Sequence, residues 1–150
     1  SIGSFYHYFS KKSDLLVGLL SLVDSALEEE VYPSLTSENE LENLHILALG
    51  FAAHVQQNGL DRSRLISSIE PFDTALDGQP RSLRLKLISL VRSGQEHGRI
   101  TSLHPPEELA DLLLIALRGV SVDWTRHGGR YDIVAAMDRF IALFLHALRA

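Results

Sequence analysis

The sequence predicts an all-helical fold. Apolar residues recur at intervals of three and four throughout the 150 residues, which is the period of an amphipathic helix, and no strand-like alternation of any length occurs. Proline residues fall only at the boundaries of these periodic segments, where helices begin or end. With 45% apolar residues, a chain of this length is expected to bury one core of its own.

The first two helices have recognisable boundaries. We expect the first over residues 13–31, because a long apolar run there stops before Pro33. The second is expected to follow Ser37 and Glu40, whose spacing is that of a capping box, and to close at Gly59.

The remaining elements follow in the same way. A shorter helix is expected over residues 61–70, and residues 72–79 are expected to form a loop. Helices then follow over residues 80–98, with a proline in the first turn, and over 109–125, which is apolar almost all round. The last helix is expected over residues 132–148.

The last two helices carry more apolar surface than one neighbour can cover. Two antiparallel helices with surplus apolar surface predict a four-helix interface between two copies of the chain. The alternative is that both helices are simply internal core. The residues expected at the dimer interface are Leu112, Ile115, Ala116, Gly119, Met137, Ile141, Phe144 and Leu148.

Composition and charge exclude several classes of protein. The chain has no cysteine, which excludes disulfide scaffolds and Cys-ligated zinc modules, and no apolar run long enough to cross a membrane. We expect a soluble, cytoplasmic domain. The net charge of -5 is unevenly spread: nine acids and no Lys or Arg lie between Lys12 and Arg62, whereas residues 81–99 hold five basic residues against Glu96. Such runs are usually solvated helix faces; the alternatives are complementary packing and a partner surface.

The start of the chain carries a short but specific motif. Residues 1–16 read SIGSFYHYFSKKSDLL, in which Tyr6, Tyr8 and Phe9 are followed by Lys12 and then by the opening of a helix. This pattern resembles the end of the helix-turn-helix in the TetR family of transcriptional regulators. A second segment, residues 98–119, resembles the region that opens the family's penultimate helix. The motif departs from the family pattern at Lys11 and Ser13.

The resemblance implies a fold, a domain organisation and a function. Residues 1–12 would be the end of an N-terminal helix-turn-helix DNA-binding domain, and residues 13–150 a TetR-like C-terminal ligand-binding and dimerisation domain. The function implied is that of a ligand-responsive transcriptional regulator, a repressor that binds operator double-stranded DNA as a homodimer and is released by a small-molecule effector. Because the chain opens without Met and without the family's first two helices, we expect the natural N-terminus to be missing.

The resemblance also assigns DNA contacts. A recognition helix reads base edges with its first residues while hydroxyl and ammonium groups hold phosphates. By that correspondence Ile2, Gly3 and His7 would face bases, and Ser4, Tyr6 and Lys12 would hold the phosphate backbone. The neighbouring aromatic side chains are expected to pack the core of the small domain.

A ligand pocket is expected among the later helices. His54 lies three residues from Phe51, on an apolar face of its helix, where a histidine is either a pocket residue or a satisfied core residue. Trp124 and His127 would form an aromatic wall or lie at the dimer interface. The expected pocket residues are Phe51, His54, Glu70, Phe72, Trp124 and His127. The helix over 13–31 would act as the lever that connects the pocket to the DNA-reading end.

Two other classes of protein were weighed against a regulator. An enzyme is not expected, because the seven histidines are scattered and no metalloprotease, hydrolase or phosphate-loop motif occurs; no metal site and no cofactor is expected. The second alternative is a helical dimerisation or adaptor module that binds only proteins, through a basic stripe formed by Arg81, Arg84 and Arg92.

Overall fold

The structure is a computed structural model that describes the backbone of residues 12–67, 75–76 and 79–150, and the side chains of residues 17–67 and 81–150. Within these ranges the chain forms five α-helices, one 3-10 turn and one short hairpin. The elements are α2 (Lys12–Glu30), η1 (Tyr32–Ser34), α3 (Glu40–Ser67), β1 (Ala75–Leu76), β2 (Gln79–Pro80), α4 (Ser82–Glu96), α5 (Pro106–Arg126) and α6 (Ile133–Leu148).

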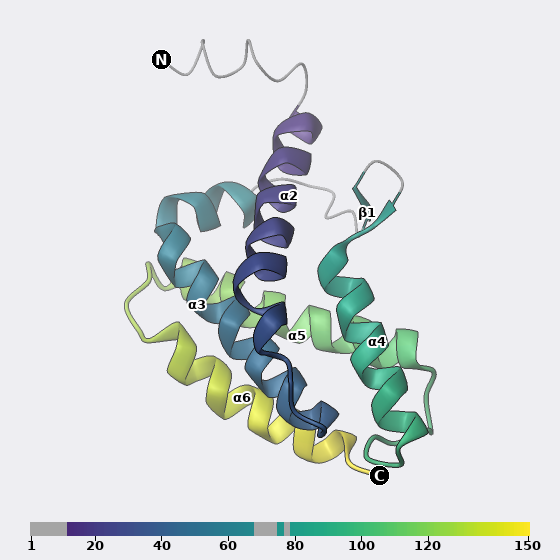
Figure 1. The fold of residues 1–150 in the computed structure, drawn as a ribbon. Helices are drawn as coiled ribbons and strands as arrows, with labels where there is room; N and C mark the ends of the chain where they lie inside the picture. Colours follow the sequence, from purple (N-terminus) through teal and green to yellow (C-terminus); the bar gives the residue numbers. More distant parts are fainter. Residues whose placement is uncertain (1–11, 68–74, 77–78) are drawn as a thin grey trace, which may run out of the picture.

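The helices pack around α3. In Figure 1, α2 stands in front of α3, α6 lies along the outer side of α3, α5 crosses behind, and α4 completes the bundle beside α2. Each helix contributes fully buried side chains to one continuous core, including Leu27, Leu47, Val91, Leu113 and Met137. No helix in the described ranges is both long enough and apolar enough to cross a membrane.

A kink divides α3 where the sequence predicts a boundary between two helices. Gly59 has φ of 79° and ψ of 172°, a conformation that glycine adopts without the steric cost of a Cβ atom. The residues after the kink turn back over α2, where Leu65 and Ile66 pack on the buried Leu20. The kink therefore folds the end of α3 across the upper half of α2.

The start of α3 differs from the predicted capping box. Asn39, rather than Ser37, accepts a hydrogen bond through its side chain from the first turn, at 3.1 Å from the backbone nitrogen of Leu41. Ser37 donates to Glu42. Glu40 does not reach back to Ser37, so the predicted reciprocal pairing was wrong.

Glu40 instead joins the start of α3 to the end of α4. Its side chain is only 6% exposed and accepts hydrogen bonds from Ser93 Oγ at 2.7 Å, from His97 Nδ1, and from Arg99 Nη1 at 2.7 Å. Burial alone raises the pKa of Glu40, but these hydrogen bonds outweigh burial and lower the pKa to about 2. The buried, charged carboxylate thus connects the start of α3 to the end of α4 and the residues that follow it.

The hairpin of β1 and β2 falls in the segment that the sequence predicted to be a loop, and it leaves the all-helical fold class unchanged. The two strands pair antiparallel, with Ala75 opposite Pro80 and Leu76 opposite Gln79. Strands of two residues are too short to produce a pattern of alternating side chains, so sequence periodicity could not reveal them.

Candidate functional site

A cavity lies between α2, α3, α4 and α5. Its walls come from the middle of α2, both sides of the kink in α3, the start of α4 and the middle of α5. Its volume is about 70 Å³. This is about half of the roughly 150 Å³ of an apolar cavity that holds benzene, so a larger ligand must move the surrounding helices apart.

Most of the cavity wall is apolar. Leu20 and Val23 contribute from α2, Phe51 from α3, and Leu114 and Val122 from α5. Leu114 and Val122 are eight positions apart, two turns of helix, so they lie on the same face of α5. This wall can bury the hydrocarbon part of a small molecule.

The polar groups of α3 form a row with a defined direction. Arg62 Nη1 donates to Asn58 Oδ1 at 2.6 Å, and Asn58 Nδ2 lies 2.6 Å from His54 Nε2. A guanidinium can only donate, so the oxygen of Asn58 must face Arg62 and its amide nitrogen must face His54. His54 Nε2 therefore accepts, and the neutral ring carries its proton on Nδ1.

The electrostatics of His54 agree with this neutral form. Burial lowers the pKa of His54, Glu30 raises it, Arg62 lowers it again, and the balance lies below the ordinary value for histidine. All three members of the row, His54, Asn58 and Arg62, line the cavity. The row therefore places polar side chains in a cavity wall that is otherwise largely apolar.

A buried ion pair connects α2 to the start of α4 beside the cavity. Arg81, whose side chain is 5% exposed, donates from Nη2 to Asp24 Oδ1 at 2.7 Å and from Nε to Asp24 Oδ2 at 3.3 Å. Arg81 Nη2 also reaches the carbonyl oxygen of Leu20 at 3.4 Å. Arg81 also lines the cavity, so the cavity wall includes a group that is bonded to α2.

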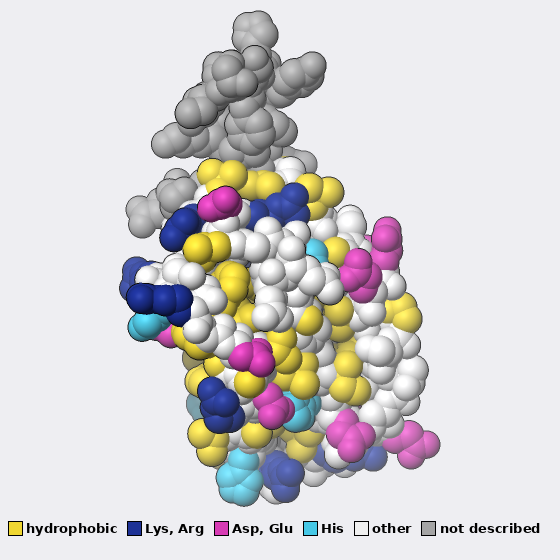
Figure 2. All heavy atoms as spheres, turned by 90° about the vertical axis from the view of Figure 1, so that its left-hand side faces the viewer, with side chains coloured by type: hydrophobic (Ala, Val, Ile, Leu, Met, Phe, Trp, Pro, Cys, Tyr) yellow, Lys and Arg dark blue, Asp and Glu magenta, His cyan; other side chains and the backbone are white. Residues whose placement is uncertain are grey.

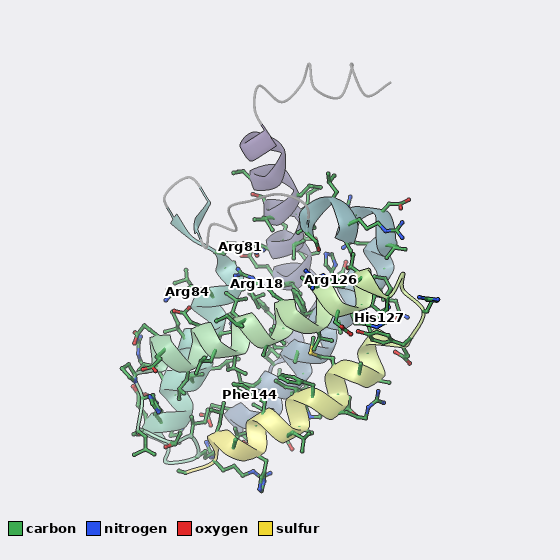
Figure 3. All side chains as sticks on the ribbon, turned by 180° about the vertical axis from the view of Figure 1, so that it is seen from behind. Arg81, Arg84, Arg118, Arg126, His127 and Phe144 are labelled. Carbon is green, nitrogen blue, oxygen red and sulfur yellow. The ribbon has the colours of Figure 1, made fainter. Side chains whose placement is uncertain are left out.

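Arg118 lies next to this pair. Figure 3 shows Arg81 and Arg118 close together where α4 begins, behind the middle of α5, and both line the cavity. Burial lowers the pKa of Arg118, and the neighbouring charge of Arg81 lowers it further, to about 10, while Asp111 and Asp24 act in the opposite direction. Asp111 is held by Arg84, with contacts of 2.6 and 3.0 Å.

The predicted pocket residues have different outcomes. Phe51 and His54 line the cavity. Trp124 faces the core instead, with its indole N–H donating to the carbonyl oxygen of Tyr131 at 2.9 Å, and His127 is exposed at the far end of α5 (Figure 3). Neither residue lines the cavity, because the face of α5 that carries Trp124 points to the core. Glu70 and Phe72 lie outside the described residues.

The cavity contains groups that sequence reasoning missed. Arg118 was not singled out, and Arg81 was assigned to a surface stripe. The available signal was a lone arginine inside the apolar segment 109–125, with Leu114 and Val122 one turn away on either side. A charged residue on an apolar helix face is worth considering as a cavity group for this reason.

The predicted dimer residues divide into two sets. Leu112 and Ile115 are exposed, as is Gly119, while Ala116 and Phe144 are half-buried. By contrast, Met137, Ile141 and Leu148 are buried in the core of the chain itself, which corrects their assignment to a surface. The reason is that α6 is apolar on two sides, and the side that carries these three residues packs on α3.

The free apolar side of α6 lies beside that of α5. Phe140 and Leu143 are exposed, with Leu143 at 76%, and a groove between α5 and α6 is lined by Ile115, Val120 and Phe140 among others. Figure 2, which looks onto the side of Figure 1 where α3 and α6 lie, shows hydrophobic atoms exposed between charged side chains. We take this side of α5 and α6 as the candidate interaction surface.

The predicted DNA contacts fall at the edge of the described chain. Ile2, Gly3, Ser4, Tyr6 and His7 lie outside the described residues. Lys12 is the first residue of α2, and its side chain is outside the described part as well.

The predicted basic stripe is largely used within the chain. Arg81 pairs with Asp24 and Arg84 with Asp111, as described above. Arg92 Nη2 donates to Glu107 at 2.6 Å. The acidic first half of the chain and the basic segment 81–99 are therefore complementary packing surfaces at two points, Asp24 with Arg81 and Glu40 with Arg99.

Solved structures with a similar fold include transcription regulators. A protein of Shewanella sp. PV-4 assigned to the TetR family of transcription regulators is 16% identical, with a TM-score of 0.69 over 100% of this chain and 81% of that chain. The ketosteroid transcriptional regulator KstR2 of Mycobacterium tuberculosis is 21% identical, with a TM-score of 0.66 over 99% and 78%. The regulator FadR of Bacillus subtilis, in complex with stearoyl-CoA, is 17% identical, with a TM-score of 0.61 over 99% and 83%.

These similarities identify the fold. No family model matches the sequence, and no curated protein matches it. The chain has the all-helical fold of TetR-type transcription regulators, as the motif in residues 1–16 predicted.

Proposed function

We propose that the chain is the sensing and dimerising part of a cytoplasmic transcriptional regulator. In this proposal it binds a small-molecule effector in the cavity between α2, α3, α4 and α5, and effector binding releases the dimer from operator DNA. The observation that carries the proposal is that Leu20 and Val23 line the cavity from α2, the helix whose first residues belong to the TetR-like motif of residues 1–16.

The cavity offers a physical route from ligand to α2. An effector can act only by binding two conformations with different affinity. At about 70 Å³ the cavity is too small for most metabolites, so binding favours a conformation in which α2 and the end of α3 have moved apart. The ion pair of Arg81 and Asp24 transmits that movement because it ties α2 to the start of α4.

The fold relatives support a small-molecule effector. KstR2 is described as a ketosteroid transcriptional regulator, and FadR was solved in complex with stearoyl-CoA, a ligand with a long hydrocarbon chain. The largely apolar wall of the present cavity fits an effector with a hydrocarbon body.

Dimerisation is proposed through the exposed apolar side of α5 and α6. Sedimentation velocity tests this directly: the chain should sediment as a dimer, and Ile115→Glu should give a monomer, because a charge at this 63% exposed position would be buried in the interface. Leu103→Glu is the matched control, since Leu103 is exposed in the loop before α5. Dissociation by both variants, or by neither, would contradict this interface.

Sensing is tested by thermal unfolding of the chain across a metabolite panel. An effector that binds the folded state raises the melting temperature, by mass action. A regulator should respond to a small set of related compounds, and a gel shift with the protein expressed from its whole reading frame should show release of DNA by the same set. A panel without any shift would contradict a sensing function.

The adaptor alternative is less well supported by the structure. It relied on Arg81, Arg84 and Arg92 as a stripe open to protein partners. Each of these arginines makes an ion pair with an acid of the same chain. A protein partner that is captured by the chain, and whose binding is unaffected by every compound of the metabolite panel, would favour the adaptor function.

A further inference from the structure

We infer that residues 61–67, at the end of α3, are a lid that opens about Gly59 to admit the effector, and that Arg62 holds this lid closed. The inference rests on the proposed sensing function for the purpose of the opening, and it adds the way into the cavity. Its evidence is the hinge, the depth to which the lid is packed and the hydrogen bonds at the hinge.

The hinge lies where α3 leaves helical geometry. Gly59 has φ of 79° and ψ of 172°, a conformation that residues with a side chain rarely adopt. A Cβ atom at this position would meet no atom within 4 Å, so the conformation, not a lack of space, requires the glycine. Leu60 still packs on the main core, and the lid therefore begins at Asp61. A rotation at one such residue can swing the lid while both parts of α3 remain helical.

The lid is packed less deeply than the other walls of the cavity. Its apolar residues, Leu65 and Ile66, are half-buried and pack on Leu20 in a cluster separate from the main core (Figure 1 shows the end of α3 turning toward α2). By contrast, Leu83 and Leu114 line the cavity from α4 and α5 and belong to the main core. Moving α4 or α5 would break that core, whereas moving the lid exposes a small cluster. The lid is therefore the wall that yields first.

Side-chain hydrogen bonds hold the lid at the hinge. Arg62 Nη1 donates to Asn58 Oδ1 at 2.6 Å, and Ser63 Oγ donates to the carbonyl oxygen of Gly59 at 3.1 Å. The first bond joins a side chain of the lid to a side chain on the other side of the hinge, and both residues line the cavity. A ligand in the cavity lies against this bond, and a ligand that offers Arg62 another acceptor favours the open lid.

Opening of the lid also reaches α2. Leu20 belongs to α2, lines the cavity and carries the packing of the lid. A closed cavity of about 70 Å³ can thus enlarge on the side where the lid and α2 meet, and the main core stays packed. The effector then acts on α2 by changing the surroundings of Leu20.

Single cysteines test the opening without any effector, because the chain has no cysteine of its own. Leu114→Cys places a thiol at a cavity position that is 3% exposed, and Leu117→Cys places one at 1% exposure on the same helix, away from the cavity. The neutral reagent dithiodipyridine forms a mixed disulfide with an accessible thiolate and releases thiopyridone, whose absorbance gives the rate. Leu114→Cys should react at least about 100-fold faster, because Leu117→Cys reacts only after global unfolding.

The role of Arg62 is tested in the two cysteine backgrounds. Arg62→Met removes the bond to Asn58 and should raise the rate of Leu114→Cys by about 3- to 10-fold, the effect of one hydrogen bond. It should leave the rate of Leu117→Cys nearly unchanged. Arg64→Met is the matched control, because Arg64 is 58% exposed and pairs with Asp61 inside the lid. This control should change neither rate.

The role of the hinge is tested in the same way. Gly59→Ala is strained in the closed conformation and should raise the rate of Leu114→Cys by about 5- to 100-fold relative to Leu117→Cys. Gly98→Ala is the matched control, because Gly98 also has a positive φ, of 68°, with no atom within 4 Å of its Cβ position, and does not line the cavity. It should raise the rates of both cysteines by the same factor.

Hydrogen exchange gives a second reading that needs no cysteine and decides the matter if a cysteine variant does not fold. Arg62→Met should lower the protection of the lid amides by about 3- to 10-fold and leave the amides of α5 unchanged. Equal loss of protection in both, equal rates for Leu114→Cys and Leu117→Cys, or an equal effect of Gly59→Ala on both cysteines would overturn the lid. A lid that opens in a chain that binds no compound of the panel would instead contradict the sensing function alone.

Discussion

The buried pair of Arg81 and Asp24 should dominate the attachment of α2 to the rest of the bundle. Asp24→Leu removes one partner and leaves the guanidinium of Arg81, 5% exposed, beside the positive charge of Arg118. Leaving a buried charge without its partner typically costs about 3–5 kcal/mol. In a chain of this size that loss corresponds to a fall in melting temperature of roughly 6–20 °C.

The double variant separates the ion pair from simple packing. Replacing both partners, as Asp24→Leu with Arg81→Met, removes the uncompensated charge, and we expect it to be within about 1 kcal/mol of the wild type. Urea unfolding, monitored by circular dichroism, gives the free energy of unfolding of the wild type, the two single variants and the double variant. With about 3–5 kcal/mol for each single variant and at most about 1 kcal/mol for the double variant, the coupling energy should be at least about 5 kcal/mol. Single variants that cost less than about 1 kcal/mol, or a double variant whose cost is the sum of the two, would refute the reasoning.

Three other predictions follow from the packing and charge of the bundle. Val23→Phe should fill the cavity and lower the free energy of unfolding by about 1–3 kcal/mol through overpacking. It should also abolish the rise in melting temperature that the ligand causes. An unchanged rise would count against α2 as part of the ligand site. Gly50→Ala should destabilise the chain by about 1–3 kcal/mol, because the new Cβ atom would lie 2.7 Å from two side-chain carbons of Val31. Adding Val31→Ala to this variant should restore part of the lost stability, and urea unfolding measures both effects. The pKa of Glu40 falls from 4.5 to about 2 on folding, so the ionised carboxylate should stabilise the fold by at most about 3 kcal/mol above pH 4.5. This contribution should be lost as the pH falls toward 2. Unfolding experiments over a pH series should show that the stability of Glu40→Gln depends less steeply on pH in this range, and equal slopes would contradict this account.

Helix positions were predictable because their signals are local. Proline, glycine and capping residues act within one turn of a helix boundary, so Asp132 marked the start of α6, where its side chain accepts a hydrogen bond from the backbone nitrogen of Ala135 at 3.0 Å. Gly59 likewise marked the kink in α3. The hairpin of β1 and β2 was missed because it has no periodic pattern to detect.

The candidate site was only partly predictable, because a helical period says which residues share a face and not what that face meets. Phe51 and His54 share a face of α3, and that face lines the cavity. On α5 the same reasoning selected Trp124, whose face meets the core, and passed over Arg118, whose face meets the cavity. Only the packing of α5 between α3 and α4 decides between the two faces.

The dimer prediction shows the same limit on α6. This helix is apolar on two sides, and the sequence does not say which side packs on α3. The structure buries Met137 and Ile141 and exposes Phe140 and Leu143. His45 on α3 contributes to this orientation through its hydrogen bond of 2.6 Å to Asp138 on α6.

A crystal structure of the chain with the compound of the metabolite panel that binds most tightly is the most direct test of the central claim, that this cavity is the effector site and that α2 forms part of it. We predict ligand density between α2, α3 and α5, against Leu20 and Val23, and a displacement of α2 relative to the present structure. Density in the groove between α5 and α6, with the cavity and α2 unchanged, would contradict the account.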